Sequence, residues 1–331
     1  MGLFSKNRGA QTAQGSAIQR TNPQITPMSE EDIQKSLQSV AEGGVPLTAK
    51  KRLEGQVGSD RPFTSTLSTS EFLALTSVGL VPISQVMGSS VYQIGYQPLP
   101  MGFSQGMAMG SLIQPQLLSV QTEALNRCRD LALSRLVDEA RAVGADGVLA
   151  VKISSGSLDF GTNVISTSIT GTAFRYPESL KPKSKSYGLG LTNLSGADVI
   201  QLVSHGYLPV GILASVVVYF APIPYLPMGS PTGPSIFGGG AGGWGGNFEI
   251  SSLSQALRYT QHIVRSSVKE QAEHMRADGV VGMDLKTGSA PIGDESTRAV
   301  YFTSSVYATA IKRAPSPQDA KPVDISLDLA T

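Results

Sequence analysis

Cysteine and histidine are scarce in this chain of 331 residues. Its one cysteine, Cys128, excludes an intrachain disulfide and is expected to be a small core or interface residue. The three histidines, His205, His262 and His274, form no His-x-x-x-His pattern, and no Cys-x-x-Cys occurs. No nucleophile stands beside a base at a motif spacing. These absences predict a protein that is not an enzyme and that holds no metal or cofactor.

Charge is also sparse, since only 15% of the residues are charged and the net charge is +1. Without a basic surplus, the chain is not expected to bind nucleic acid. Two runs lack charged residues altogether: 51 residues between Glu71 and Glu123, and 50 residues between Asp198 and Glu249. Surface strands and loops ordinarily collect charge, so both runs are expected to be covered.

Three kinds of cover are compatible with the uncharged runs. A membrane-spanning helix over residues 207–228 has a suitable length but contains four prolines. Contact with a membrane surface would use residues 101–109 and 236–244, which lack flanking Lys and Arg. Burial against sister domains is favoured, because residues 80–91 and 210–220 are typical of strands too apolar for a solvated sheet.

The start of the chain shows no targeting signal. Position six lacks the Ser or Thr of a myristoylation pattern, and no apolar signal-peptide core follows, so a cytoplasmic location is expected. Residues 1–28 are poor in apolar residues and are predicted to be disordered. Residues 29–62 are predicted to be a short helical segment and linker, with Ser29 as a helix cap and residues 46–53 as a second short turn.

The rest of the chain repeats itself. Residues 67–82 align without a gap on residues 194–209, an offset of 127. A long helical pattern then ends in Ala-Asp-Gly at 145–147 and again at 277–279, an offset of 132. The chain is therefore expected to divide into a first domain at 63–178, a second at 188–313 with a Gly-rich insertion at 228–247, and a linker and tail at 314–331.

The turns after the two long helices together contain a signature of five residues. Gly144 stands where a helix C-cap requires positive φ. Asp146 and Asp278 are expected to make local hydrogen bonds and not to act as catalytic acids. Gly147 and Gly279 complete the signature.

Residues 143–151, Val-Gly-Ala-Asp-Gly-Val-Leu-Ala-Val, and the Gly-Thr-Ala at 171–173 resemble the YbjQ-like family, which is labelled as heavy-metal-binding. The second copy departs from this pattern, with Met275 and Arg276 before the turn and Ala-Thr-Ala at 308–310. The resemblance implies an α+β fold of two tandem two-layer domains, each a long helix on a small antiparallel sheet of dodecin-like type. It also implies closure into a ring-shaped oligomer, a pentamer. The metal label of the family corresponds to no residue of this chain.

Two loops are expected to contact a partner. The Gly-rich stretch at 228–247 lacks both phosphate-binding glycine patterns, and the stretch at 102–110 is rich in Met, which suits an adaptable surface. The candidates for contact with a ring lumen, an unknown protein or a membrane surface are Met101, Phe103, Met107, Met109, Phe237 and Trp244. Residues 323–329 alternate as a strand does, and could pair with a sheet edge of a neighbouring chain.

The favoured function is that of a structural or scaffolding protein whose partner is itself. Two alternatives remain open. The first is a metal-binding or small-ligand-binding protein that uses the crevices between domains or the lumen of the ring. The second is an assembly attached to a membrane surface.

Overall fold

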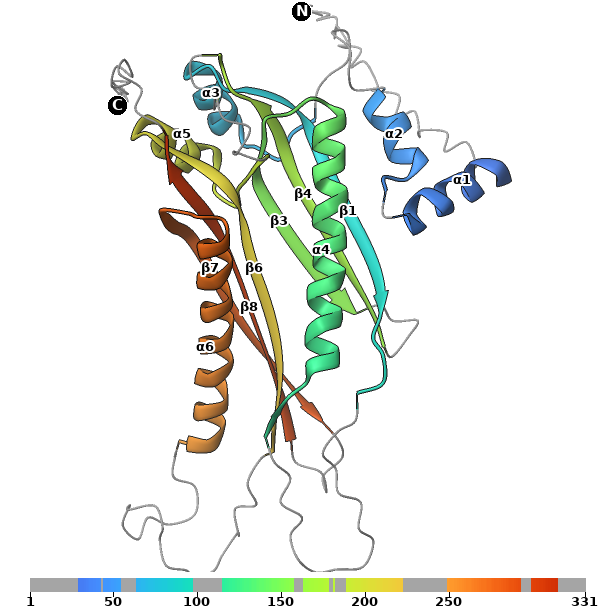
Figure 1. Cartoon of the computed structure of the whole chain (residues 1–331), viewed down its shortest axis with the longest axis vertical. Helices are drawn as coiled ribbons and strands as arrows, with labels where there is room; N and C mark the ends of the chain where they lie inside the picture. The colour runs from blue at the N-terminus through green and yellow to red at the C-terminus, as the bar shows by residue number, and fades with distance from the viewer. Residues whose placement is uncertain are drawn as a thin grey trace, which may run out of the picture.

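The chain adopts an α+β fold with six helices and two four-stranded sheets in the residues that the computed structural model describes (Figure 1). These residues are 29–42, 44–54, 64–97, 115–157, 163–178, 181, 189–222, 249–292 and 299–314.

Two helices precede the sheets. α1 (Glu30–Ala41) begins after Ser29, whose hydroxyl accepts a hydrogen bond from Asp32 N, so the predicted cap is confirmed. α2 (Leu47–Glu54) follows and buries Leu53. Figure 1 shows both helices beside the β1 border of the first sheet, with α1 extending away from it.

The first unit, as we name it, consists of α3 (Thr69–Ser77), β1 (Val81–Gln93), α4 (Ser119–Ala142), β3 (Gly147–Ser157) and β4 (Val164–Arg175). The strands lie in the order β1-β4-β3 and are antiparallel. α4 covers β1 and β4. At Gly88 the helix comes so close that an added Cβ would lie 2.0 Å from Ala132 O, so this contact requires glycine.

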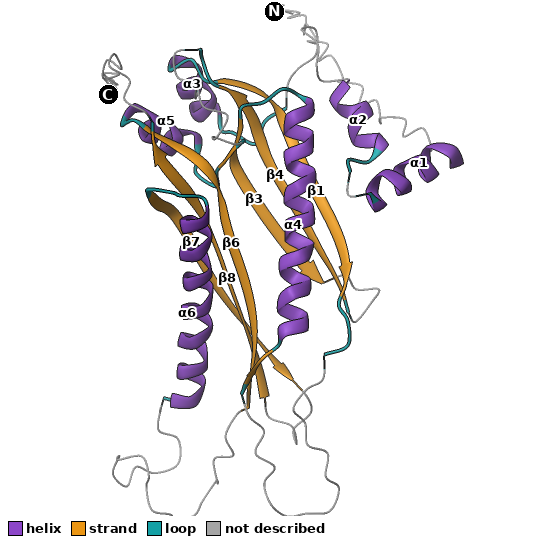
Figure 2. Ribbon diagram, viewed as in Figure 1, coloured by secondary structure: helices purple, strands orange, loops and turns teal. Residues whose placement is uncertain are grey.

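The second unit consists of α5 (Gly196–Ser204), β6 (Tyr207–Pro222), α6 (Ser251–His274), β7 (Gly279–Ile292) and β8 (Ala299–Arg313). Its strands lie in the order β6-β8-β7, and α6 covers β6 and β8. Figure 2 shows α4 and α6 on the same side of the two sheets, and α3 and α5 together at one end. Residues 207–222, weighed above as part of a membrane span, are a strand. In the described ranges, no helix is long and apolar enough to cross a bilayer.

The two units share their backbone irregularities as well as their order of elements. A bulge follows Pro82 in β1 and Pro209 in β6, at the offset of 127 found in the sequence. Gly144, which directly follows the C-cap residue Val143, has a φ of 66°, the positive value expected at this position. Arg276 adopts a φ of 51° at the same place without being glycine. The residues with positive φ form three such pairs: Gly79 with Gly206, Gly144 with Arg276, and Ala150 with Gly282.

Each unit also adds a two-residue strand to the sheet of the other. β2 (Gln116–Leu117), just before α4, pairs antiparallel with β6. β5 (Gly190–Leu191), just before α5, pairs parallel with β3. The prediction of wholly antiparallel sheets is therefore wrong at β5, because this segment arrives from the first unit in the direction of β3.

Candidate assembly interface

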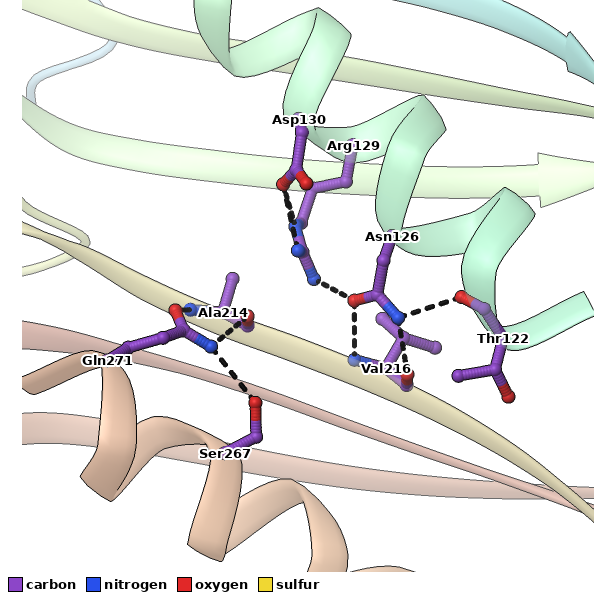
Figure 3. Close-up of polar contacts among 8 residues, drawn as sticks. All are labelled: Thr122, Asn126, Arg129, Asp130, Ala214, Val216, Ser267 and Gln271. Atoms are coloured by element: carbon purple, nitrogen blue, oxygen red, sulfur yellow. Dashed lines mark hydrogen bonds and ion pairs between the residues drawn. The ribbon is translucent and has the colours of Figure 1, made fainter. Parts of the chain in front are cut away.

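The contact between the two units is built along the outer edge of β6, the edge that faces away from β8. Backbone N–H and C=O groups on such an edge need partners when they are buried. At Ala214 the partner is the side chain of Gln271 on α6, whose Oε1 accepts from Ala214 N at 3.2 Å and whose Nε2 donates to Ala214 O at 3.0 Å (Figure 3).

The next positions along β6 are bonded by α4 of the other unit. Asn126 Oδ1 accepts from Val216 N at 3.1 Å and Asn126 Nδ2 donates to Val216 O at 2.8 Å (Figure 3). Thr122 Oγ1 accepts from Val218 N at 3.0 Å, and Leu118 N donates to Val218 O at 2.9 Å. β2 then continues the pairing as an ordinary strand. Helix side chains therefore complete a sheet edge of the neighbouring unit.

The amide of Asn126 is held in one orientation by a full set of partners. Its Oδ1 also accepts from Arg129 Nη1 at 2.6 Å, and its Nδ2 also donates to Thr122 O at 2.7 Å. Arg129 is buried and pairs with Asp130 at 2.8 Å. Buried polar networks stabilise a contact only when their groups are satisfied, and here the amide of Asn126 has all of its hydrogen-bonding positions filled.

Apolar side chains of both units fill the space behind this edge. Ile212 and Ala214 of β6 lie in a groove between α4 and β3, which we name the inner groove. Its walls include Leu136, Ala140 and Val151. β5 closes the groove, since Thr192 N donates to Val148 O and Val151 N donates to Thr192 O, each at 3.0 Å. The contact therefore combines a dry core with strand pairing, as stable interfaces do.

The short helices form the far end of the contact. Glu71, in the first turn of α3, accepts from Ser68 N at 2.8 Å, and Ser68 Oγ accepts from Glu71 N at 3.3 Å, so the two residues form a capping box. Ser68 Oγ also donates to the Glu71 carboxylate at 2.7 Å. Its other oxygen accepts from Gly196 N of α5 at 3.1 Å. The hydrogen bonds from Ser68, followed by the one from Gly196, hold the pKa of the Glu71 carboxyl below its ordinary value.

β1 is the counterpart of β6, but its outer edge is open in the described part of the chain. Met87, Ser89 and Val91 are exposed, whereas their counterparts Ala214, Val216 and Val218 are buried. α2 lies beside this edge and leaves a crevice of about 320 Å³ along Met87, Gly88 and Ser89.

Charged side chains replace the amides at this open edge. Glu139, the counterpart of Gln271, accepts from Met87 N at 2.8 Å and pairs with Arg52 of α2. Arg52 also donates to Gln85 O, and Arg135 donates to Ser89 O. The backbone N–H and C=O groups of this edge are therefore hydrogen-bonded by charged side chains, which water can also solvate.

The counterpart of the inner groove is also open. Between α6 and β7 lies a groove of about 230 Å³, which we name the outer groove. Met283 and Val280 of β7 lie on one side, and Val268 and Ala272 of α6 lie on the other. No strand of the described residues lies beyond β7.

The two predicted turn aspartates make hydrogen bonds, but to residues 30 and 35 positions further along the chain and not to sequence neighbours as was expected. Asp146 accepts from Tyr176 N at 3.0 Å and Asp278 accepts from Arg313 N at 2.7 Å, which ties each turn to the end of its sheet. A Cβ at Gly147 would lie 2.6 Å from the carbonyl oxygen of Gly190, whereas at Gly279 the nearest atom would be 3.4 Å away. Cys128 is fully buried, as predicted, and its Sγ lies 3.5 Å from Ser90 O.

The loop and tail candidates fall outside the described residues. These are Met101, Phe103, Met107, Met109, Phe237 and Trp244, together with residues 323–329. The contact residues Asn126, Gln271 and Thr122 were missed, because a polar residue on a helix gives no signal that it reaches a neighbouring strand. One indication of these contact residues was present in the sequence: alignment of the two copies at the offset of 132 places Gln271 opposite Glu139.

The described histidines do not lie together as metal ligands would. His205 Nδ1 lies 2.7 Å from Gln201 O, and His262 and His274 are exposed on α6. Within the described ranges, no group of three or more His, Cys, Asp or Glu side chains is placed to hold a metal ion.

A crevice of about 480 Å³ lies between the units beside this contact. Its lining includes Arg129, Lys286 and Tyr307. Lys286 is already paired with Asp284 at 2.9 Å. Burial raises the pKa of the Tyr307 hydroxyl, which is therefore neutral at pH 7.

Comparison with known proteins gives two matches and one absence. Residues 117–176 match the model of a family described as "Putative heavy-metal-binding". The chain is 27% identical over 269 residues to the encapsulin nanocompartment protein Rv1762c of Mycobacterium tuberculosis, which covers 80% of this chain and 91% of that protein. No solved structure matches. The segment 117–176 contains no histidine and one cysteine, the buried Cys128.

Proposed function

We propose that this protein is a non-enzymatic structural protein that assembles with copies of itself. One observation carries the proposal: no described residue covers the outer edge of β1 along Met87, Ser89 and Val91, although the same edge of β6 is covered by a complete interface. Exposed sheet edges are ordinarily blocked or paired. The relative named as an encapsulin nanocompartment protein supports an assembly role, because that name describes a compartment built from protein subunits.

The proposal includes the organisation of the chain. The two units are tandem copies of one YbjQ-like domain, with boundaries at 63–178 and 188–313. Matching bulges and matching positive-φ residues support duplication, although the family model covers only part of the first unit. A closed ring of five chains is the assembly that the family resemblance implies, since homologous faces on linked domains favour closure.

The native mass of the purified protein tests the proposal. Light scattering coupled to gel filtration is expected to give a mass several times 34.7 kDa, and five times that mass for the pentamer. A monomer at every concentration up to about 100 µM would reject self-assembly, since stable interfaces of this kind associate well below that level. An oligomer of another number would reject the pentamer alone.

Binding of a small ligand in the crevice between the units is a second candidate. Two cationic side chains, Arg129 and Lys286, and a neutral phenol line a volume in the range of ligand pockets. Native mass spectrometry of the purified protein is expected to show a species that is heavier by the mass of a bound anionic ligand. This species is expected to be absent from Lys286→Ser. Protein without any added mass would count against this function and leave assembly untouched.

A further inference from the structure

Six exposed large hydrophobic residues occupy positions whose counterparts in the other unit are buried. Leu73 on α3 is 60% exposed, whereas Ile200 on α5 is 4% exposed. Met283 on β7 is 48% exposed, whereas Val151 on β3 is 5% exposed. The six pairs are Leu73 with Ile200, Val81 with Leu208, Met87 with Ala214, Val91 with Val218, Met275 with Val143, and Met283 with Val151.

The buried members of these pairs lie in the contact between the units. Ile200 and Leu208 pack with Leu149 and Phe174 of the first unit, and Ala214 packs in the inner groove. Four exposed members lie on α3 and β1, Met283 lies on β7, and Met275 lies at the end of α6. The first unit therefore exposes one surface of such a contact, on α3 and β1, and the second unit exposes the complementary surface at β7.

We infer that a second copy of this chain fills both halves, so that β1 of one copy enters the outer groove of the next as β6 enters the inner groove within the chain. This contact presupposes the self-assembly proposed above and names its surface. Met87 takes the place of Ala214, against Val268, Ala272 and Met283 of the other copy.

The two surfaces match in polarity. In the contact within the chain, Ile212 of β6 and Leu133 of α4 belong to one apolar cluster. At the open surfaces, the counterpart of Ile212 is Gln85 and the counterpart of Leu133 is Arg265. An apolar residue is thus replaced by a polar one on both sides, so neither copy would bury a polar side chain against an apolar wall.

The strand segment that would pair with β7 is already held in place. Thr192 and Asn193, which follow β5, are anchored on Thr309 Oγ1 at 2.9 and 3.2 Å. Their counterparts Ser65 and Thr66 are anchored in the same way on Thr172 Oγ1, at 3.3 and 3.0 Å. Residues 64–67 therefore form a fixed counterpart of the segment that pairs with β3, and β7 is a sheet edge beside which the described part of the chain places no strand.

The contact joins unlike surfaces, which makes it heterologous. Each copy exposes β1 on its first unit and the outer groove on its second unit, so copies associate head to tail. Gly279 agrees with this. Its counterpart Gly147 has to be glycine because the backbone of β5 lies against it, whereas no described residue imposes the same requirement at Gly279.

A disulfide between copies tests the register. Leu191 is the register partner of Val148 in the pair of β5 with β3, so the equivalent pair between copies is Thr64 with Val280. A chain with Thr64→Cys and Val280→Cys is expected to form dimers and higher species under mild oxidation, whereas each single variant is not. Leu191→Cys with Val148→Cys is the matched control and is expected to close within one chain, because neighbouring strands lie at disulfide distance.

Met87→Asp tests the groove, with Tyr259→Arg as its control. Tyr259 is exposed on α6, and its counterpart Arg127 stays exposed beside the contact within the chain. Met87→Asp is expected to weaken association at least about tenfold, and Tyr259→Arg is expected to leave it unchanged. Circular dichroism shows whether both variants remain folded.

Three outcomes separate this inference from the proposed function. Cross-linked oligomers together with weakened association of Met87→Asp support the inference. An oligomer that forms no cross-link, while the control pair closes, overturns this contact and leaves self-assembly standing. A protein that is monomeric at all concentrations overturns both.

Discussion

β1 and β6 occupy the same place in the two units, but the N–H and C=O groups along their outer edges are hydrogen-bonded by different kinds of side chain. In the second unit, Gln271 both donates to and accepts from the buried edge of β6. In the first unit, Glu139 can only accept, and Arg52 from α2 balances its charge. The difference teaches that α2, although it lies outside the first unit, completes that unit, since its Arg52 is the cation that the open edge requires.

The two long helices also differ in how closely they approach their sheets. Gly88 of β1 allows α4 to contact the backbone of the strand, whereas its counterpart in β6 is Ser215. A substitution at Gly88 is therefore the single change expected to lower the free energy of unfolding most.

Gly88→Ala is expected to lower the free energy of unfolding by roughly 3–4 kcal/mol, above the usual range for overpacking, because the new methyl group meets helix backbone atoms that cannot rotate away. Urea unfolding measures the change. Ser215→Ala is the matched control and should cost less than about 1 kcal/mol. Equal costs for the two would show that α4 can shift outward freely.

Arg52→Ala is expected to cost about 3 kcal/mol, because it leaves the buried carboxylate of Glu139 without its cation. Lys51→Ala, one residue earlier, removes only an exposed pair with Asp32 and should change the stability by less than about 0.5 kcal/mol.

Adding Glu139→Gln to Arg52→Ala makes the first unit resemble the second, and most of the lost stability should return. Thermal unfolding of the three variants gives the comparison. Failure of the double variant to recover would mean that Arg52 acts through its packing and its bond to Gln85 O.

Asn126→Ala is expected to cost about 1–3 kcal/mol, because the buried N–H and C=O of Val216 lose their partner. Hydrogen exchange of the Val216 amide should accelerate. The amide of Ala214, which Gln271 still bonds, is the internal control. Unchanged exchange at Val216 would show that this edge is covered without Asn126.

The smallest expected effect is a dependence on acid. Because the folded state lowers the pKa of Glu71, its contribution to stability is complete above the unfolded pKa, near 4.5. It is lost as the pH falls through the lower, folded value. Stability measured from pH 7 to pH 3 should therefore decline less steeply for Glu71→Gln than for the unchanged chain, and identical profiles would contradict the role of this carboxylate.

Much of each unit could be predicted from local patterns. The helix ending at Gly144, the Asp146 turn and the two apolar strands follow from periodicity and turn chemistry, which depend on neighbouring residues. β2 and β5 could not be predicted, because two-residue strands carry no period and exist only through the partner unit.

From the sequence, the interface could be predicted only as a requirement that the uncharged strands be covered. The uncharged runs indicated that strands at 80–91 and 210–220 are covered, and the structure confirms this for β6 through the first unit. Which side chains provide the cover depends on the relative placement of two helices and a distant strand, which local patterns do not encode. α3 and α5 were recognised as repeated sequence but not as helices.

The covalent link between the units has a consequence for any ring that they build. Every second junction lies within a chain and includes Asn126, whereas the junctions between chains have Arg258 at that position, which can donate but not accept. Strong and weak junctions would therefore alternate around the circumference, and the number of units would always be even. Such a ring comes apart only into whole chains, so the duplication sets the smallest piece in which the assembly can be dismantled or repaired.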